Sequence, residues 1–195
     1  MTDRTAMYPK DEISMTDTDF RSHIRSIADF PKPGILFRDI TTLLENPVAL
    51  RAAAERLAEP FRESGVRKVV VIESRGFLVG GIIAYLLGAG LVIIRKSGKL
   101  PYRTHSVSYA LEYGTDQIEI HDGAIEPGER VLLHDDLLAT GGTMAAAASL
   151  VQKVGGEIAA ASFLVELGTL GGREVLRRQG VETVDALVNY FDESE

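Results

Sequence analysis

Two adjacent acids followed by a segment rich in threonine and glycine carry the clearest chemistry in this sequence. Asp135 and Asp136 follow the apolar residues 131–133 and one histidine, and an alanine-rich stretch begins after residue 143. Two leucines come after the acids, and then Ala139, Thr140, Gly141, Gly142 and Thr143. If a strand runs into a helix here, the backbone N–H groups and the positive end of the helix dipole favour an anion. Residues 139–143, the phosphate loop below, are therefore a candidate phosphate site.

The two acids indicate a second group beside that phosphate, because carboxylates would repel a phosphate unless they faced something else. Carboxylates accept hydrogen bonds from sugar hydroxyls and can hold Mg²⁺ through water. Phosphate on the loop and ribose on Asp135 and Asp136 would together describe a ribose 5-phosphate site. The alternative is that the loop only turns the chain and caps a helix. The sequence contains neither G-x-x-x-x-G-K-[ST] nor G-x-G-x-x-G, so the common nucleotide-binding loops are unsupported.

Composition limits the possible partners. The 195 residues include 21 basic and 28 acidic side chains, a net charge of −7, and no cysteine. The acidic balance argues against broad binding to nucleic acid or to an anionic membrane. The lack of cysteine excludes disulfides and thiolate metal sites and suits a reducing compartment, so we expect a cytoplasmic protein.

Basic residues are concentrated in one part of the chain. Residues 67–105 hold seven basic side chains and one acidic side chain, a net charge of +6, which leaves −13 for the remainder. A cationic segment in an acidic chain suggests a small anionic ligand. A chance cluster of solvated charges is the alternative.

Short apolar segments alternate with helical segments from residue 69 onward. Strands are expected at 69–72, 91–94, 131–133, 158–165 and 181–188, and helices at 76–87, 143–154 and 170–178. This alternation predicts a parallel sheet covered on both faces. Ligands of such sheets bind at the carboxyl ends of the strands, where the acids and the phosphate loop would lie.

The remaining segments predict an extension, two helices and a hairpin. Residues 1–18 are polar and aperiodic and are expected to form a disordered extension, so that residues 19–195 are one domain. Helices are expected at 20–30 and from Pro47 to Ser64, the second capped by Asn46. A β-hairpin is expected from strands at 107–113 and 117–121.

The uncharged segment 77–94 has 18 residues, the lower limit for a membrane span. Glycines at 88 and 90 divide it, so a buried helix followed by a buried strand is favoured, and we expect no membrane association. The N-terminus lacks a basic region followed by an apolar run, so no signal peptide is expected.

Residues 132–143 resemble the signature of the type I phosphoribosyltransferases, which bind 5-phosphoribosyl-1-pyrophosphate (PRPP). Four further blocks follow the pattern of the adenine-specific members, in the family's order and over about residues 19–190. These blocks are residues 30–40, 73–77, 95–101 and 108–114. The resemblance implies an α/β fold with a parallel twisted sheet flanked by helices. An inserted hairpin, a flexible cationic lid at 95–106 and a small N-terminal hood at about 19–45 complete the implied fold.

The same resemblance implies an activity and partners. The phosphoribosyl group of PRPP would pass to adenine, giving AMP and pyrophosphate in a Mg²⁺-dependent purine salvage reaction. No residue would ligate the metal directly; Mg²⁺ would be held by substrate and water, with Asp135 the candidate contact. The implied assembly is a homodimer.

Individual roles follow from the matching blocks. The loop residues 139–143 with Asp135 and Asp136 would bind the 5′-phosphate and ribose. Glu112 would be the catalytic general base that accepts the proton at purine N7. A non-proline cis bond is implied near Ser74. The implied pyrophosphate-binding residues are Ser74, Arg75, Lys99, Arg103 and Tyr113. The implied adenine-binding residues are Leu36, Phe37, Arg38 and Leu137.

Two alternative functions remain open at this point. A phosphoribosyltransferase for guanine or xanthine would need a basic residue aimed at the 6-oxo group, and none can be placed in the 36–38 slot. A non-catalytic regulator that senses PRPP would need an added DNA-binding domain, and the residues before Asp19 are too few to form one.

Overall fold

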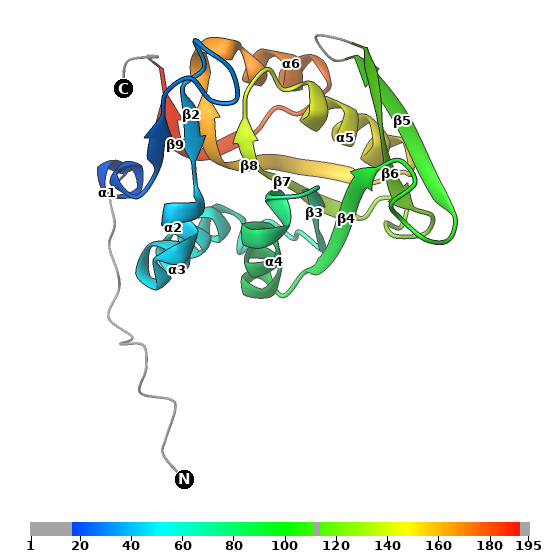
Figure 1. Ribbon diagram of the computed structural model, residues 1–195. Coiled ribbons are helices and arrows are strands. Elements are labelled where there is room, and N and C mark those ends of the chain that lie inside the picture. The colour runs from blue at the N-terminus through cyan, green and yellow to red at the C-terminus, as the bar shows by residue number, and fades with distance from the viewer. Residues whose placement is uncertain (1–16, 111–113, 192–195) are drawn as a thin grey trace.

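Seven strands form one sheet in the computed structural model, which describes residues 17–110 and 114–191. Their order across the sheet is β5-β6-β4-β3-β7-β8-β9 (Figure 1). The parallel strands are β3 (Lys68–Ile72), β4 (Gly90–Lys96), β7 (Arg130–Leu138), β8 (Glu157–Leu167) and β9 (Val184–Tyr190). The antiparallel strands are β5 (Thr104–Ala110) and β6 (Thr115–His121).

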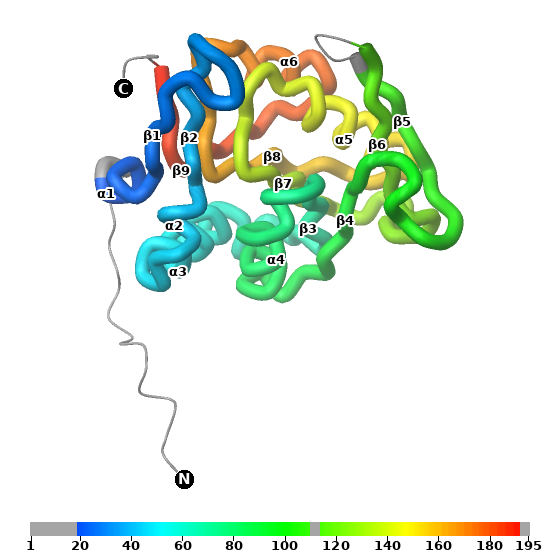
Figure 2. The backbone as a smooth tube through the Cα atoms, in the orientation of Figure 1, coloured from blue at the N-terminus to red at the C-terminus, as the bar shows by residue number. Residues whose placement is uncertain are grey.

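Helices cover both faces of this sheet, as Figure 2 shows. On one face lie α3 (Pro47–Ala58) and α4 (Gly76–Leu87), and on the other α5 (Gly142–Lys153) and α6 (Gly172–Arg178). Successive residues of a strand point to opposite faces. Val69 and Val71 therefore join the core under α3 and α4, whereas Val70 and Ile72 join the core under α5. The predicted parallel sheet with helices on both faces is confirmed.

Several boundaries differ from those expected. The helix at 76–87 matches residue for residue. The strand expected at 131–133 continues to Leu138, so Asp135 and Asp136 lie within β7 and not after it. The last strand begins at Val184, not at 181, and α6 begins at Gly172 after the short 3₁₀ turn η3 (Gly168–Leu170).

The helix expected from Pro47 to Ser64 is shorter than predicted. Its start is confirmed, because the Asn46 side chain accepts hydrogen bonds from the backbone N–H groups of Val48 and Ala49 at 3.0 and 3.1 Å. The α-helix ends at Ala58, and Pro60 lies in the 3₁₀ turn η2 (Glu59–Phe61). Proline lacks the N–H that would continue an α-helix, which explains the early end.

The helix expected over residues 20–30 is wrong. The chain forms α1 (Asp17–Ser22), β1 (Arg25–Ile27), β2 (Phe37–Asp39) and α2 (Thr41–Glu45). A separate antiparallel sheet joins β1 to β2, and Arg25 pairs with Asp39 at 2.5 Å across it. Residues 19–45 are called the hood below.

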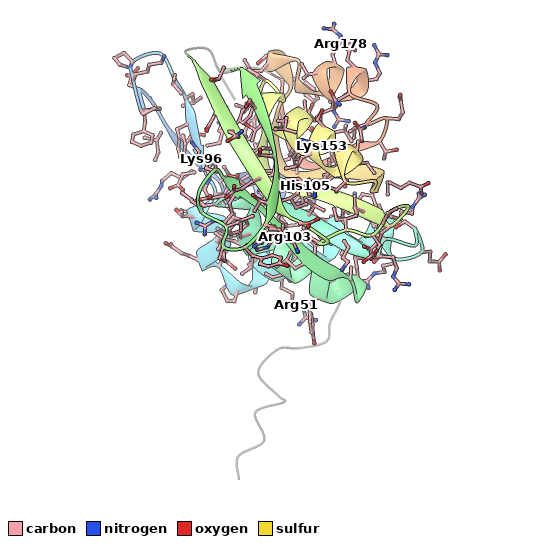
Figure 3. The ribbon with its side chains drawn as sticks, turned by 90° about the vertical axis from the view of Figure 1, so that its right-hand side faces the viewer. Arg51, Lys96, Arg103, His105, Lys153 and Arg178 are labelled. Carbon is pink, nitrogen blue, oxygen red and sulfur yellow. The ribbon has the colours of Figure 1, made fainter. Side chains whose placement is uncertain are left out.

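The hairpin insertion is confirmed, with β5 and β6 paired from Thr104–His121 to Ala110–Thr115. Lys153 of α5 donates to the Ser106 carbonyl at 3.1 Å and ties the hairpin to that helix (Figure 3). In the described ranges, no helix has the length and apolar character needed to cross a bilayer. The uncharged residues 77–94 form α4 and β4, as expected.

Candidate functional site

A cavity of about 460 Å³ lies at the carboxyl ends of β3, β4 and β7. Its polar lining is charged with both signs and includes Glu73, Arg75, Arg95, Lys96, Asp135 and Asp136. The neighbouring parallel strands β4, β3 and β7 therefore place the acids and the basic residues at one edge of the sheet. Ligands of α/β proteins bind at this edge.

The phosphate loop lines an adjoining hollow of about 100 Å³ together with Asp135 and Leu137. Gly141 has φ +83°, a left-handed conformation that favours glycine, and α5 begins at the next residue. The N–H groups of the first turn of α5 therefore open onto the hollow, as an anion site at a helix N-terminus requires. Every residue predicted for the loop lies at this hollow.

Gly172 at the start of α6 packs directly against the phosphate loop. A Cβ atom at this position would lie 2.4 Å from the Ala139 carbonyl oxygen, and one at Gly141 would lie 2.8 Å from the Gly172 carbonyl oxygen. Arg173, the second residue of α6, forms bidentate hydrogen bonds of 2.6–2.9 Å to the Glu166 carboxylate, which is 3% exposed. These bonds hold α6 in place. This support was not predicted from the sequence, where its local sign is the Gly171-Gly172 pair.

The two acids of β7 differ in their surroundings. Asp136 forms an ion pair with Arg75 at 2.8 Å, and its own N–H donates to the Asp135 carboxylate at 2.9 Å. Burial, followed by repulsion from Asp136, raises the pKa of Asp135 well above its usual range. Burial also raises the pKa of Asp136, although the Arg75 guanidinium opposes that change. Burial thus disfavours the charged form of both acids, and the Arg75 guanidinium favours charge on Asp136.

Arg75 links the acids to the hood. Its guanidinium carbon lies 5.5 Å from the centre of the Phe37 ring, while its Nε atom faces Asp136. The expected non-proline cis bond is present between Glu73 and Ser74. Ser74 and Arg75 both line the larger cavity, as predicted for an anion-binding turn.

Glu73 gathers the basic residues beside this turn, a role that the sequence did not indicate. It accepts hydrogen bonds from Lys99 Nζ, from Arg95 at 3.2 and 3.3 Å, and from the Lys96 N–H at 3.2 Å. These donors lower the pKa of Glu73 to about 2. Lys96 pairs with Asp116 of β6 at 2.9 Å. Lys99 thus reaches the edge of the cavity through Glu73.

The segment 97–103 is held by a buried acid of the hairpin. Glu119 is 5% exposed and accepts from the N–H groups of Lys99 and Leu100 at 3.1 and 3.0 Å. Arg103 instead turns to the Tyr102 hydroxyl at 3.0 Å and does not line the cavity (Figure 3). Glu119 was also missed, because a glutamate between Ile118 and Ile120 is typical of the solvent-facing residue of an alternating strand.

Comparisons with known proteins agree on one family. Residues 39–189 match the model of the phosphoribosyl transferase domain. The chain belongs to the phosphoribosyl transferase family. An adenine phosphoribosyltransferase of Methylobacterium radiotolerans is 56% identical over 162 residues, covering 83% of this chain and 90% of that protein.

Solved structures of the family have the same architecture. The adenine phosphoribosyltransferase of Thermoanaerobacter pseudethanolicus is 44% identical, with a TM-score of 0.85, and the match covers 90% of this chain and all of that one. The enzyme of Saccharomyces cerevisiae is 36% identical, with a TM-score of 0.82 over 88% of this chain and 98% of that one. It was solved with adenine and an imino-altritol bisphosphate.

In this phosphoribosyl transferase chain, the residues predicted to bind adenine point in two directions. Phe37 faces Arg75 and lies 5.1 Å from the Phe30 ring, centre to centre, and Leu137 lines the larger cavity. Leu36 and Arg38 line a second cavity of about 350 Å³ between the hood and β9. A slot beside Phe37 would therefore meet the backbone of residues 36 and 38, not their side chains.

Two predicted residues, Glu112 and Tyr113, lie outside the described residues. The strands before and after them, β5 and β6, are described, and the last pair of this hairpin is Ala110 with Thr115. Tyr109 and Asp116, which flank that end, both line the larger cavity. His105 lies in β5, and its ring hydrogen-bonds the Asp122 carboxylate at 3.0 Å.

Proposed function

We propose that this protein transfers the phosphoribosyl group of PRPP to adenine, giving AMP and pyrophosphate. The bond between the anomeric carbon and the diphosphate oxygen breaks, the bond from that carbon to adenine N9 forms, and adenine gives up one proton. The observation that carries the proposal is the order of the charged groups in the cavity. The phosphate loop, the acid pair and the basic residues follow one another as the phosphate, ribose and diphosphate of PRPP do.

The donor would lie along this row. The phosphate loop would take the 5′-phosphate, Asp135 and Asp136 the ribose hydroxyls, and Ser74, Arg75 and Lys99 the diphosphate. Guanidinium groups suit phosphate because their planar fork matches two oxygens. As the diphosphate leaves, positive charge develops at the anomeric carbon, and fixed carboxylates next to it stabilise that charge.

The acceptor would lie between Phe37 and Leu137, with its exocyclic amine against the backbone of residues 36–38. Glu112 would accept the proton at N7 as N9 attacks, and Tyr113 would close the donor side. Arg103 would have to leave Tyr102 to contribute to diphosphate binding.

Mg²⁺ is proposed as the cofactor, held through PRPP oxygens and water. The carboxylates available beside the ribose position are Asp135 and Asp136, and oxygen ligands suit this ion. No group of three potential metal ligands gathers in the described part of the chain. When bound, the ion would neutralise charge on the leaving diphosphate.

We also propose a cytoplasmic homodimer. The absence of cysteine supports a reducing compartment. Large apolar side chains of Leu78 and Tyr85 on α4 and Leu91 on β4 are exposed, Tyr85 by 85%, which supports contact with a second copy. Light scattering should give twice the chain mass, and Tyr85→Lys should lower it. A wild-type monomer would refute the dimer.

The central experiment mixes the purified protein with Mg²⁺, PRPP and one base at a time, and separates the products by chromatography. Adenine should yield AMP, and guanine, hypoxanthine and xanthine should yield no nucleotide. Product from guanine or xanthine in place of AMP would favour the oxopurine enzyme, and PRPP binding without turnover would favour a sensor.

Glu112→Ala tests the proposed base. Turnover should fall at least about 100-fold while PRPP binding, measured by calorimetry, survives. Glu63→Ala is the matched control, because Glu63 is exposed and lies outside the cavity. Unchanged turnover in Glu112→Ala would remove Glu112 from the mechanism.

A further inference from the structure

The hood strands that carry the proposed adenine contacts are not part of the main sheet. β1 and β2 form a two-stranded sheet of three residue pairs, with no hydrogen-bonded neighbour in the seven-stranded sheet. A two-stranded sheet is marginal by itself. The position of residues 36–38 over the cavity must therefore be set by side chains that join the hood to the body. Apolar side chains of the hood make part of this connection, because Phe20, Ile24, Ile40 and Leu43 lie in the core under α3 and α4.

Arg38 adds a buried charged side chain to this connection. Side chains alternate along β2, so Phe37 faces Arg75 whereas Arg38 turns toward β9. Arg38 is 7% exposed, and its guanidinium carbon lies 3.8 Å from the centre of the ring of Tyr190, the last residue of β9. Its Nη1 atom donates to the Ser26 hydroxyl of β1 at 2.5 Å. The guanidinium of Arg38, a residue of β2, therefore contacts both β1 and β9.

The Tyr190 ring also contacts a side chain of α1. Arg21 lies with its guanidinium carbon 4.7 Å from the Tyr190 ring centre and donates to the neighbouring Asn189 carbonyl. Tyr190 is 3% exposed, so both cations lie against a ring that water hardly reaches. Cation–π contacts gain strength when desolvated. The end of β9 is thus the point on which two elements of the hood converge.

We propose that the Arg38 side chain positions the acceptor base, acting through Tyr190 and not by its own contact with the base. It fixes the backbone of residues 36–38 opposite Leu137, and so sets the width of the slot that adenine enters. The donor groups lie on β3, β4, β7 and the phosphate loop, which Arg38 does not hold. Loss of the contact should therefore weaken adenine and spare PRPP. This inference rests on the proposed function, because it takes adenine as the acceptor.

The test compares Arg38→Met, Tyr190→Leu and the double variant with the wild type. Each single variant should raise the KM for adenine about tenfold, the equivalent of one desolvated cation–π contact. The KM for PRPP should change less than about twofold. The double variant should lose less than the sum of the two single effects, because both substitutions remove the contact between Arg38 and Tyr190, although Tyr190→Leu also removes the contact of Arg21 with the ring.

Arg51→Met is the matched control, since Arg51 forms an ordinary i,i+4 pair with Glu55 on α3. It should leave both KM values unchanged. Ser26→Ala, which removes only the hydrogen bond to Arg38, keeps the test usable if Arg38→Met fails to fold, and should raise the adenine KM in the same direction.

Three results would overturn the inference: an unchanged adenine KM, an equal rise in both KM values, or additive effects in the double variant. Failure of the proposed function is distinguishable, because it appears in the wild type as no AMP from adenine. In that case adenine binding is measured by calorimetry. Weaker adenine binding in Arg38→Met than in the wild type supports the positioning role. A wild type that does not bind adenine refutes both the proposed function and the positioning role.

Discussion

Substitution of Gly172 by alanine adds one methyl group where α6 meets the phosphate loop. The new Cβ atom would lie 2.4 Å from the Ala139 carbonyl oxygen and 2.7 Å from Leu138 Cδ1. The leucine can turn aside, but the carbonyl belongs to the backbone. To reach 3.0 Å, the loop and the helix must separate by 0.6 Å (3.0 − 2.4).

Overpacking of this kind costs about 1–3 kcal/mol, and the lower chain entropy of alanine in the unfolded state offsets about 0.4–1 kcal/mol. We therefore expect Gly172→Ala to lose about 1–2 kcal/mol of unfolding free energy, measured by urea titration with circular dichroism. The displaced loop should also raise the KM for PRPP about tenfold, because small misplacements of binding groups are costly. The KM for adenine should hardly change.

Gly81→Ala on α4 provides the control, because its Cβ would meet nothing closer than 3.9 Å. It should leave both KM values unchanged and add up to about 1 kcal/mol of stability, as expected for alanine in a helix. The reasoning is refuted if Gly172→Ala keeps wild-type stability within about 0.5 kcal/mol together with an unchanged KM for PRPP.

Three further predictions follow. Glu73→Gln removes a carboxylate that competes for the basic residues, and should tighten inorganic pyrophosphate binding about 3- to 10-fold by calorimetry; weaker binding would contradict this. Burial lowers the pKa of His134 to about 4, so the unfolded chain takes up its proton first. Wild-type stability should accordingly fall by up to about 3 kcal/mol as the pH drops from about 6.5 toward 4. His134→Gln should show no such component in urea titrations across that range, and an identical pH slope in both proteins would disprove the assignment. Arg173→Met leaves Glu166 buried without its partner and should lower the free energy of unfolding by about 3 kcal/mol, measured by thermal melts. The exposed control Arg178→Met should lower it by less than about 1 kcal/mol. Equal losses would show that burial of the pair is immaterial.

The main sheet was predictable because its information is local. Runs such as Val69–Val71 are apolar on both faces, which only a doubly covered strand satisfies, and the glycines at 88 and 90 divide α4 from β4. The phosphate loop was predictable for the same reason, since its hydroxyls and glycines are close in the chain to the acids Asp135 and Asp136.

The hood could not be predicted, because its sheet depends on partners distant in sequence. Phe20 and Ile24 have helical spacing, yet the helix ends at Ser22 and the chain turns to pair Arg25 with Asp39. Tertiary contacts of this kind override local propensity. Glu119 escaped prediction likewise, because its backbone partners lie about 20 residues earlier in the chain.

The basic residues of the larger cavity have a consequence for how an anion arrives. Arg75, Arg95 and Lys96 line this cavity and Lys99 lies near its edge, and each is already paired with a carboxylate of this chain. Such pairs nearly cancel at a distance, so they exert little long-range pull on a charged molecule in solution. Binding becomes an exchange of partners on contact, in which a phosphate replaces a carboxylate. Added salt then weakens the old and the new pairing together, and association should depend far less on ionic strength than capture by an open basic surface does.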